Sequence, residues 1–516
     1  MPGGLLQLSA FGSASTYLHA DPQITFWKQA WRRSTPFALE SIEMPFNGGP
    51  ADFGRKTTAA ITRAADMAHR AWLEITLPDL ADYYTAQVSA TADQPLVLRA
   101  FFDSPTTFVV RVRKPTSTAV AWTKFRVYDA TDDTLLGEDN IFDPAETTDV
   151  TITVAEARRD RTIYVVASDD AAPAATSDQS SPRDVLCLRW TNSIGHAVVD
   201  NVEWEIGGTR MDKVPNSDFF DVWTELTEKE EKREGFNAMV GKYDGYDIWE
   251  TGRSHGGERT YFVPLVFSFC ASPTQSIPVV ALQFHEARIN IAFREALECI
   301  KCNVPVAQLV SSSGTPLAIK DCRLFVDMAF LDTEERRRMV SMPHEALITQ
   351  IQYLGDVVVA PDDPSITRRI PLDGLNHPIK ELIWVYQPYD AYQRDAVNGN
   401  DWFRYGEDPF DLVRLTLNGS ERMSPRSGQY FRQVQPYQHH TRVPQKHVHC
   451  YNFGLEPEST SPTGACNFSR LDQAALHVVL NPAAMHVNGG KIKVWALGYN
   501  VVRYDQGLAG LAFVSS

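Results

Sequence analysis

A serine in a glycine-flanked segment is the first residue whose surroundings suggest covalent chemistry. Residues 252–256 read Gly-Arg-Ser-His-Gly, the letter pattern of a nucleophile elbow, in which the serine lies on a turn from a strand to a helix. The residues that follow, 257–269, read GERTYFVPLVFSF and are typical of a strand instead of a helix. We therefore interpret residues 252–256 as a glycine-rich loop and expect no hydrolase site there.

Two His-Glu pairs begin like the helix of a zinc protease, which needs a second histidine four residues after the first. The pairs are His285-Glu286 and His344-Glu345, and the positions that should hold the second histidine are Ile289 and Ile348. Neither pair therefore offers two imidazoles on one helical face. We expect both pairs to be structural.

Two further histidine clusters have spacings that metal sites use. His447 and His449 would lie on one face of a strand, as in metal-binding jelly rolls of the cupin type. Those sites also take a glutamate shortly after the second histidine, and residues 450–454 offer none. The neighbours His439 and His440 lie in a loop-like segment, where imidazoles sometimes bind metal but more often form local hydrogen bonds. We expect no metal ion at either cluster.

The remaining motifs give no catalytic or cofactor site. Cys299 and Cys302 form a lone CxxC without a second pair at zinc-ribbon spacing and without the βαβ pattern of a redox domain. Asn418 and Asn467 begin glycosylation sequons, which a protein without a secretory signal would use only by an unusual route. Phosphate-binding and dinucleotide-binding patterns are missing from the sequence. We expect no cofactor and no enzymatic activity.

Composition places the chain among ordinary globular proteins. Its 516 residues are 43% hydrophobic and 22% charged, and the formal net charge is −15, which argues against a protein that coats nucleic acid. The N-terminus lacks a basic region ahead of an apolar stretch, and the longest apolar run, residues 261–271, is too short to span a bilayer and reads as a buried strand. Seven irregularly spaced cysteines favour a reducing compartment over a disulfide framework.

Alternation of apolar and polar residues indicates that the protein is mainly β, with one apolar and one polar face to each strand. Examples are residues 72–77, 202–206, 288–293, 413–417 and 491–497. Two helices are also predicted: one over residues 217–234, ending at Gly235, and one beginning at Asp332, whose side chain can cap it while Glu335 reaches back. Pro343 then marks the main domain junction.

Residues 80–185 differ in composition from the rest of the chain. They contain a single glycine, no cysteine, 10 basic and 17 acidic residues. Five runs in this interval predict the strands of a small immunoglobulin-like sandwich, and residues 171–182 predict a flexible return linker. The runs are 96–102, 107–113, 123–129, 149–155 and 161–167. We therefore expect an inserted module.

A series of segments along both halves of the chain resembles the major capsid proteins of the nucleocytoplasmic large DNA viruses, including iridoviruses and large algal viruses. The segments agree in order and in spacing, and they leave out only the interval 80–185. They include GGLLQL (3–8), WTNSIGHAVVDNVEWEIGGTRMDK (190–213), IPVVALQFHEARINIAFR (277–294), HPIKELIWVYQ (377–387), YFRQVQPYQHHTRVP (430–444) and KIKVWALGYNVVRYDQGLAGLAF (491–513).

The resemblance implies an all-β tandem double jelly roll, made of two eight-stranded antiparallel sandwiches with short helices. It implies a homotrimer of pseudo-hexagonal outline that tiles an icosahedral shell, and contacts with minor capsid, cement and penton proteins. The expected location is the virion, after assembly inside the host cell, without direct contact to nucleic acid. The inserted module has no counterpart in this pattern, and we expect it to project outward for contact with a host surface or with neighbouring capsomers.

The expected organisation is an N-terminal arm over residues 1–26, a first jelly roll over 27–342 interrupted by the module, and a second over 343–516. The arm is small and apolar without strong periodicity, so we expect it to order only on contact with neighbours. Its assembly residues are Gly3, Gly4, Leu5, Leu6, Gln7 and Leu8. Two alternatives stay open: a carbohydrate-binding or carbohydrate-processing β-sandwich protein, and a minor or vertex capsid protein.

Overall fold

The structure is a computed structural model in which the chain divides into two compact units, Met1–Phe37 and Ala38–Ser516. It describes residues 3–29, 31–80, 83–85, 96–104, 107–113, 124–130, 134–140, 147–153, 162–168, 183–184, 188–243, 258–302, 309–311, 315–361, 367–393, 400–485 and 487–514. The N-terminal unit contains two short helices, α1 (Gly3–Ser9) and α2 (Ser13–His19), and neither has a buried residue.

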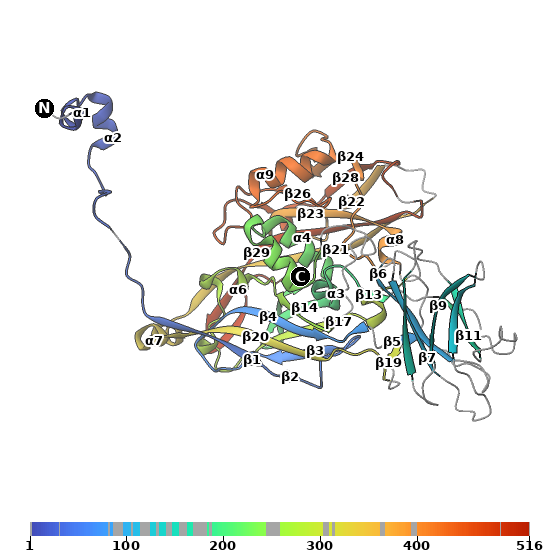
Figure 1. Ribbon diagram of the computed structural model, residues 1–516. Coiled ribbons are helices and arrows are strands. Elements are labelled where there is room, and N and C mark those ends of the chain that lie inside the picture. The colour runs from blue at the N-terminus through green and yellow to red at the C-terminus, as the bar shows by residue number, and fades with distance from the viewer. Residues whose placement is uncertain are drawn as a thin grey trace. The chain divides into compact units, whose positions relative to one another are not determined.

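The first half of the large unit is a sandwich of two sheets (Figure 1). One sheet has the order β1 (Phe37–Met44), β20 (Asp321–Leu331), β4 (Met67–Leu77), β16 (Arg259–Pro264). The other has the order β15 (Thr209–Val214), β14 (Val199–Ile206), β17 (Ala287–Phe293), β3 (Lys56–Ala60), with β2 (Phe46–Asn47) added at its edge. With β2 set aside, these eight strands numbered along the chain run 1-8-3-6 and 5-4-7-2, which is the order of a jelly roll.

The second half repeats this order. One sheet contains β21 (His344–Val359), β29 (Gly490–Asp505), β23 (Pro378–Pro388) and β26 (His449–Asn452), with β27 (Cys466–Asn467) on β23 and β30 (Leu508–Leu511) on β29. The other contains β22 (Thr367–Pro371), β28 (Ala474–Leu480), β24 (Phe410–Leu417) and β25 (Ser420–Glu421). The predicted tandem of two eight-stranded jelly rolls is therefore confirmed.

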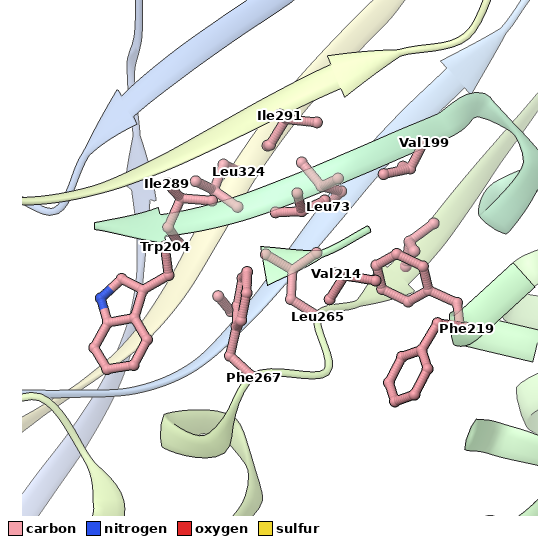
Figure 2. Close-up of a cluster of buried hydrophobic side chains, with 14 of the residues drawn as sticks. Leu73, Val199, Trp204, Val214, Phe219, Leu265, Phe267, Ile289, Ile291 and Leu324 are labelled. Atoms are coloured by element: carbon pink, nitrogen blue, oxygen red, sulfur yellow. The ribbon is translucent and has the colours of Figure 1, made fainter. Parts of the chain in front are cut away.

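Alternation of side chains builds the core of the first roll. In β4, the buried residues are every second one from Ala71 to Leu77, because successive side chains point to opposite faces. Figure 2 shows the cluster that forms between the two sheets, with Leu73 and Leu324 from one sheet and Ile289 and Ile291 from the other. The burial of these apolar side chains holds the sheets together.

The strands of the second roll that face the first are buried on both sides. In β23 all residues except Pro378 are buried, and in β29 Lys493 is buried together with Ile492 and Val494. The expectation of a polar outer face over residues 491–497 was therefore wrong, because the outer face of this sheet is covered by residues of the first roll that belong to the same hydrophobic cluster. A buried lysine on that face needs an anionic partner, and Asp218 of the first roll provides it.

The interval predicted as a module contains two antiparallel sheets. One is formed by β6 (Leu96–Ser104), β7 (Thr107–Arg113) and β10 (Thr147–Thr153), and the other by β8 (Lys124–Asp129), β9 (Leu135–Asn140), β11 (Thr162–Ser168) and β12 (Arg183–Asp184). Each of the five predicted runs overlaps one of these strands. Residues 171–182, predicted as a linker, lie outside the described residues.

Two short strand pairs flank the module. They are β5 (Tyr83–Thr85) with β19 (Leu309–Ser311), and β13 (Leu188–Trp190) with β18 (Ile300–Cys302). The register of the first sheet shows where the interval begins: Leu77, at the end of β4, pairs with Arg259 at the start of β16, and Thr76 pairs with Asp321 at the start of β20. Three long connections therefore meet at one end of the first sandwich.

Helices and single turns occupy the connections. The α-helices are α3 (Ile194–Val198), α4 (Ser217–Thr227), α5 (Arg233–Val240), α6 (Ser268–Ala271), α7 (Thr333–Ser341), α8 (Tyr389–Tyr392) and α9 (Gln435–His439). The shorter turns are η3 (Glu230–Lys232), η4 (Pro273–Gln275), η5 (Val279–Ala281), η6 (Ala296–Cys299), the π-turn η7 (Tyr430–Val434) and η8 (Phe468–Arg470). In the described parts of the chain, no helix has the length and apolarity to span a membrane.

Four predictions about helices and strands have clear outcomes. The helix expected over residues 217–234 is two helices, because the charged run after Leu226 has no apolar face to bury and the chain is extended at Glu228. The left-handed glycine that ends α5 is Gly241, with φ of 72°, and not Gly235. The apolar run 261–271 is a strand only as far as Pro264 and then turns into α6. Asp332 caps α7 as predicted, by accepting a hydrogen bond from the Glu334 amide.

Candidate functional site

Helix α4 of the first roll carries an acidic row into the contact with the second roll. Asp218, Asp221 and Glu225 are spaced so that they follow one side of the helix, and all three are buried. Lys493 of β29 lies 2.5 Å from the Asp218 carboxylate, and Lys446 lies 2.7 Å from that of Asp221. The two rolls are thus joined by ion pairs that are shielded from water.

The carboxylates of this row share further cations. Lys242, just beyond α5, lies 3.3 Å from Asp221 and also contacts Glu225, and Arg442 of the second roll lies 3.8 Å from Glu225. Burial alone would raise the pKa of Asp221, but the Lys242 and Lys446 ammonium groups outweigh it and lower that pKa to about 2. Asp221 is therefore ionised at neutral pH.

A second contact joins the rolls through residues 400–402. The Asn400 side-chain amide donates hydrogen bonds of 2.8 Å to the carbonyls of Leu297 and Ile300, and the indole of Trp402 donates one of 2.8 Å to the Glu298 carbonyl. Next to them, Lys301 and Asp401 form a buried ion pair at 3.1 Å. Hydrogen bonds in two places make the orientation of one roll on the other specific.

Sequence reasoning missed both contacts. The signal in the sequence is the spacing of Asp218, Asp221 and Glu225, which places all three along one side of the predicted helix. Carboxylates in such a position require cations from elsewhere in the fold. The cations themselves, Lys446 and Lys493, carry no local pattern that marks them.

The arm residues Gly3, Gly4, Leu5, Leu6, Gln7 and Leu8 form most of α1. Their apolar side chains are exposed, with Leu8 at 78% of its full accessibility, and so is Trp27 at 98%. Exposed leucine and tryptophan side chains on one short segment are typical of a surface that another protein covers. The six residues expected to act in assembly thus lie on one helix, and their leucine side chains are available to a neighbouring protein.

The histidines with possible metal chemistry are placed in different environments. His285 bonds to the backbone of Ala509, and His344 stacks on Tyr504, so both have structural contacts. His449 is fully buried, which lowers its pKa to about 3, and His447 lies 3.7 Å from Asp408. His440 differs from these, because its ring lies between the carboxylates of Glu381, at 2.6 Å, and Glu458, at 3.0 Å.

The cysteine pair and the sequons are also placed. Cys299 is buried, and burial raises the pKa of its thiol to about 12, while the side chain of Cys302 lies outside the described residues. Asn418 is exposed at a turn with φ of 49°, and Asn467 is exposed with its side-chain oxygen accepting the amide of Ser469. The serine of the segment 252–256 lies outside the described residues.

Comparison with known proteins gives the context for this architecture. The family described as "Large eukaryotic DNA virus major capsid protein" matches residues 335–510, and "Major capsid protein N-terminus" matches 25–102 and 162–332. The major capsid proteins of Pyramimonas orientalis virus and Phaeocystis pouchetii virus are 31% and 30% identical to this chain, and each alignment covers 99% of the chain and 100% of the relative.

A solved structure supports the fold. PBCV-1 VP54 superposes with a TM-score of 0.63 at 23% identity, over 95% of this chain and 100% of that one. The break in the N-terminal family match, between 102 and 162, falls inside the interval that the sequence sets apart. With two jelly rolls in tandem and relatives of at least 30% identity along nearly its entire length, this chain belongs to the major capsid protein family of the large eukaryotic DNA viruses.

Proposed function

We propose that three copies of this chain form a capsomer of pseudo-hexagonal outline and that such capsomers tile an icosahedral virion shell. The observation that carries the proposal is the repeated strand order in one chain, because three copies then present six similar sandwiches around a threefold axis. The buried ion pairs of α4 support it, since they hold the two sandwiches of each chain in one orientation. Membership in the capsid protein family points the same way.

The proposed activity is self-association without a catalytic step and without a cofactor. The net charge of −15 suits a shell protein that makes no direct contact with the genome. The proposed location is the virion shell, after synthesis and assembly inside the host cell. A carbohydrate-binding or carbohydrate-processing function is not favoured, because the relatives are capsid proteins over their whole length.

The organisation we propose keeps an arm over residues 1–26, a first roll over 27–342 and a second over 343–516. The arm would order when its exposed apolar residues, Leu5, Leu6 and Leu8, contact a neighbouring chain. Minor capsid, cement and penton proteins are further proposed partners. Asn418 and Asn467 are exposed and therefore open to glycosylation if the chain meets the enzymes.

The interval 80–185 would act as an outward decoration that contacts a host surface or a neighbouring capsomer. The support is its position at an end of the first sandwich, where three long connections meet, and its own two sheets. A density map of the particle tests this directly. Density for the module on the outer surface is expected, and density beneath the shell would contradict the proposal.

Light scattering on a sizing column, followed by negative-stain imaging of the peak, tests the capsomer. The expected mass is three times 57.8 kDa, with a pseudo-hexagonal outline. A stable monomer at micromolar concentration would contradict it. Abundance in purified particles separates a major from a minor or vertex capsid protein, because only the major protein dominates the particle mass.

A further inference from the structure

Three potential metal ligands of different chemistry meet in the second roll. Strands β23 and β26 pair with Glu381 opposite Asn452 and Ile383 opposite Cys450, so Glu381 and Cys450 are diagonal neighbours on one face of the sheet. His440, directly after α9, reaches the same point, with its Nε2 atom 2.6 Å from the Glu381 carboxylate. Two strands and one helix terminus therefore converge on one small volume.

The ligand atoms of Glu381, His440 and Cys450 lie within 4.8 Å of one another. In a tetrahedral zinc site, metal–ligand distances of about 2.0–2.3 Å place ligand atoms roughly 3.3–3.8 Å apart. Shifts of about 1 Å would thus bring all three onto one cation. No other group of three such residues in the described part of the chain meets this criterion.

Burial distinguishes this cluster from an ordinary surface group of acids. The side chains of Glu381 and His440 are 0% exposed, and Cys450 is buried as a free thiol. One oxygen of Glu381 contacts His440, but the other, Oε2, is buried without a hydrogen-bond partner. A carboxylate oxygen in that state has lost its water and gained no compensating contact. This oxygen is therefore available to a positively charged group.

The neighbouring residues suit a metal centre. Glu458 accepts at 3.0 Å from the Nδ1 atom of His440, which is the usual way in which a carboxylate orients a metal-bound imidazole. The side-chain amide of Asn452 donates a hydrogen bond to the Cys450 sulfur at 3.7 Å. Glu458 also lines a cavity of about 390 Å³, whose lining does not include Glu381, His440 or Cys450.

We propose that Glu381, His440 and Cys450 bind one divalent transition-metal cation, with Zn²⁺ the best fit to a carboxylate, an imidazole and a thiolate. The Cys450 thiol and the His440 Nε2 each release a proton to solvent when the metal binds. One thiolate, one carboxylate and one neutral imidazole then balance the two positive charges of the cation. The ion would fasten the end of α9 to β23 and β26, and Glu458 is a positioning residue.

The rival arrangement is a metal-free one, in which a protonated His440 pairs with Glu381 and Glu458. The two arrangements differ in whether Cys450 is a thiolate. Co²⁺ bound by a thiolate gives an intense near-ultraviolet charge-transfer band, which an ion triad cannot give. Cobalt is therefore the probe that separates them.

The experiment uses the full chain, purified under reducing conditions, stripped with a chelator and titrated with Co²⁺ and then Zn²⁺. We expect a charge-transfer band that saturates at about one Co²⁺ per chain and is displaced by Zn²⁺. The Cys450→Ser variant should lose the band, and His440→Gln should weaken Co²⁺ binding at least roughly tenfold. Cys466→Ser is the matched control, because Cys466 lies on β27 of the same sheet outside the cluster, and it should keep the band.

Either result of the titration decides the proposal. Absence of a stoichiometric band in the parent protein overturns it, and so does a band that persists in Cys450→Ser. If Cys450→Ser does not fold, the parent spectrum together with its Zn²⁺ content after purification and its rise in Tm with added Zn²⁺ still decides. A parent protein without the band, and without Zn²⁺ stabilisation, contains the metal-free ion triad.

Discussion

Lys446 of the second jelly roll lies 2.7 Å from the carboxylate of Asp221 on helix α4 of the first. The two residues are 225 positions apart in the chain, and Asp221 is fully buried. Removal of one partner from a buried ion pair is strongly destabilising, because the remaining charge is left without a counter-charge and without water. The contact therefore makes the stability of each roll depend on the other.

Removal of the Asp221 carboxylate tests this dependence. The variant Asp221→Ala leaves Lys242 and Lys446 with one fewer buried anion, and we expect a loss of about 3–5 kcal/mol in the free energy of unfolding. Urea unfolding measures it. The control is Glu345→Ala, which removes an exposed partner of Arg503 and should cost less than about 1 kcal/mol. Similar losses in the two variants would contradict a buried network.

Asp212 gives a pH-dependent prediction. It is buried, burial raises its pKa to about 7, and its Oδ2 atom has no hydrogen-bond partner. The folded state thus holds a proton that the unfolded state releases near pH 4, so Asp212 lowers stability progressively as the pH rises from about 4 to about 7. Asp212→Asn removes this loss and keeps an oxygen that can accept from the Ile351 amide.

We expect Asp212→Asn to raise Tm relative to the parent at pH 8 by a few degrees, at roughly 1 °C per kcal/mol recovered for a chain of 516 residues. At pH 5 the gain should be smaller, because the parent carboxyl is then largely protonated. Differential scanning fluorimetry at the two pH values makes the comparison. A gain of equal size at both would show that Asp212 does not titrate in this window.

Gly241 and Gly235 form a matched pair for the backbone. Gly241 has φ of 72°, and a Cβ atom there would lie 2.6 Å from the Tyr261 ring, so Gly241→Ala should be destabilising by more than about 1 kcal/mol. Gly235 lies inside α5 with no atom within 4 Å of a built Cβ, so Gly235→Ala should be neutral or stabilising. Thermal unfolding of both variants checks the opposite signs.

Deletion of residues 2–20 separates trimer formation from lattice assembly. The arm belongs to the N-terminal unit and exposes its apolar side chains, so we expect light scattering to show that the truncated chains still form trimers. Assembly into sheets or shells, followed by electron microscopy, should be impaired. Normal assembly of the truncated protein would refute a role for Gly3 to Leu8.

The strands were predictable from sequence because their signal is local. Alternation identified β4 and β17, and the runs at 107–113 and 161–167 identified strands of the module. Alternation described β29 wrongly because the first roll covers its outer face, and nothing within residues 491–497 reports that distant contact. The resemblance, which uses order along the whole chain, supplied the tandem architecture that local patterns could not.

The residues of the contacts between the rolls and of the Glu381 cluster show the same difference between local signals and distant contacts. Asp332 was recognised as a cap because capping depends on neighbours within one turn. The pairing of Lys446 with Asp221 and the approach of His440 to Glu381 depend on tertiary placement over 225 and 59 residues. The predicted stop at Gly235 failed because a glycine marks a helix end only where the left-handed conformation is used, as at Gly241.

The carboxylates of α4 and the lysines of the second roll lie far apart along the chain, which has a consequence for synthesis on the ribosome. The acidic row of Asp218, Asp221 and Glu225 emerges well before Lys446 and Lys493 have been translated. At roughly 5–20 residues per second, the 225 residues from Asp221 to Lys446 take roughly 10–45 s to make. During that interval Lys242 of the first roll can pair with Asp221 and Glu225, but Asp218 is still without Lys493. The apolar face that the second roll covers also stays exposed, so the first roll completes its packing only after the second roll has been made.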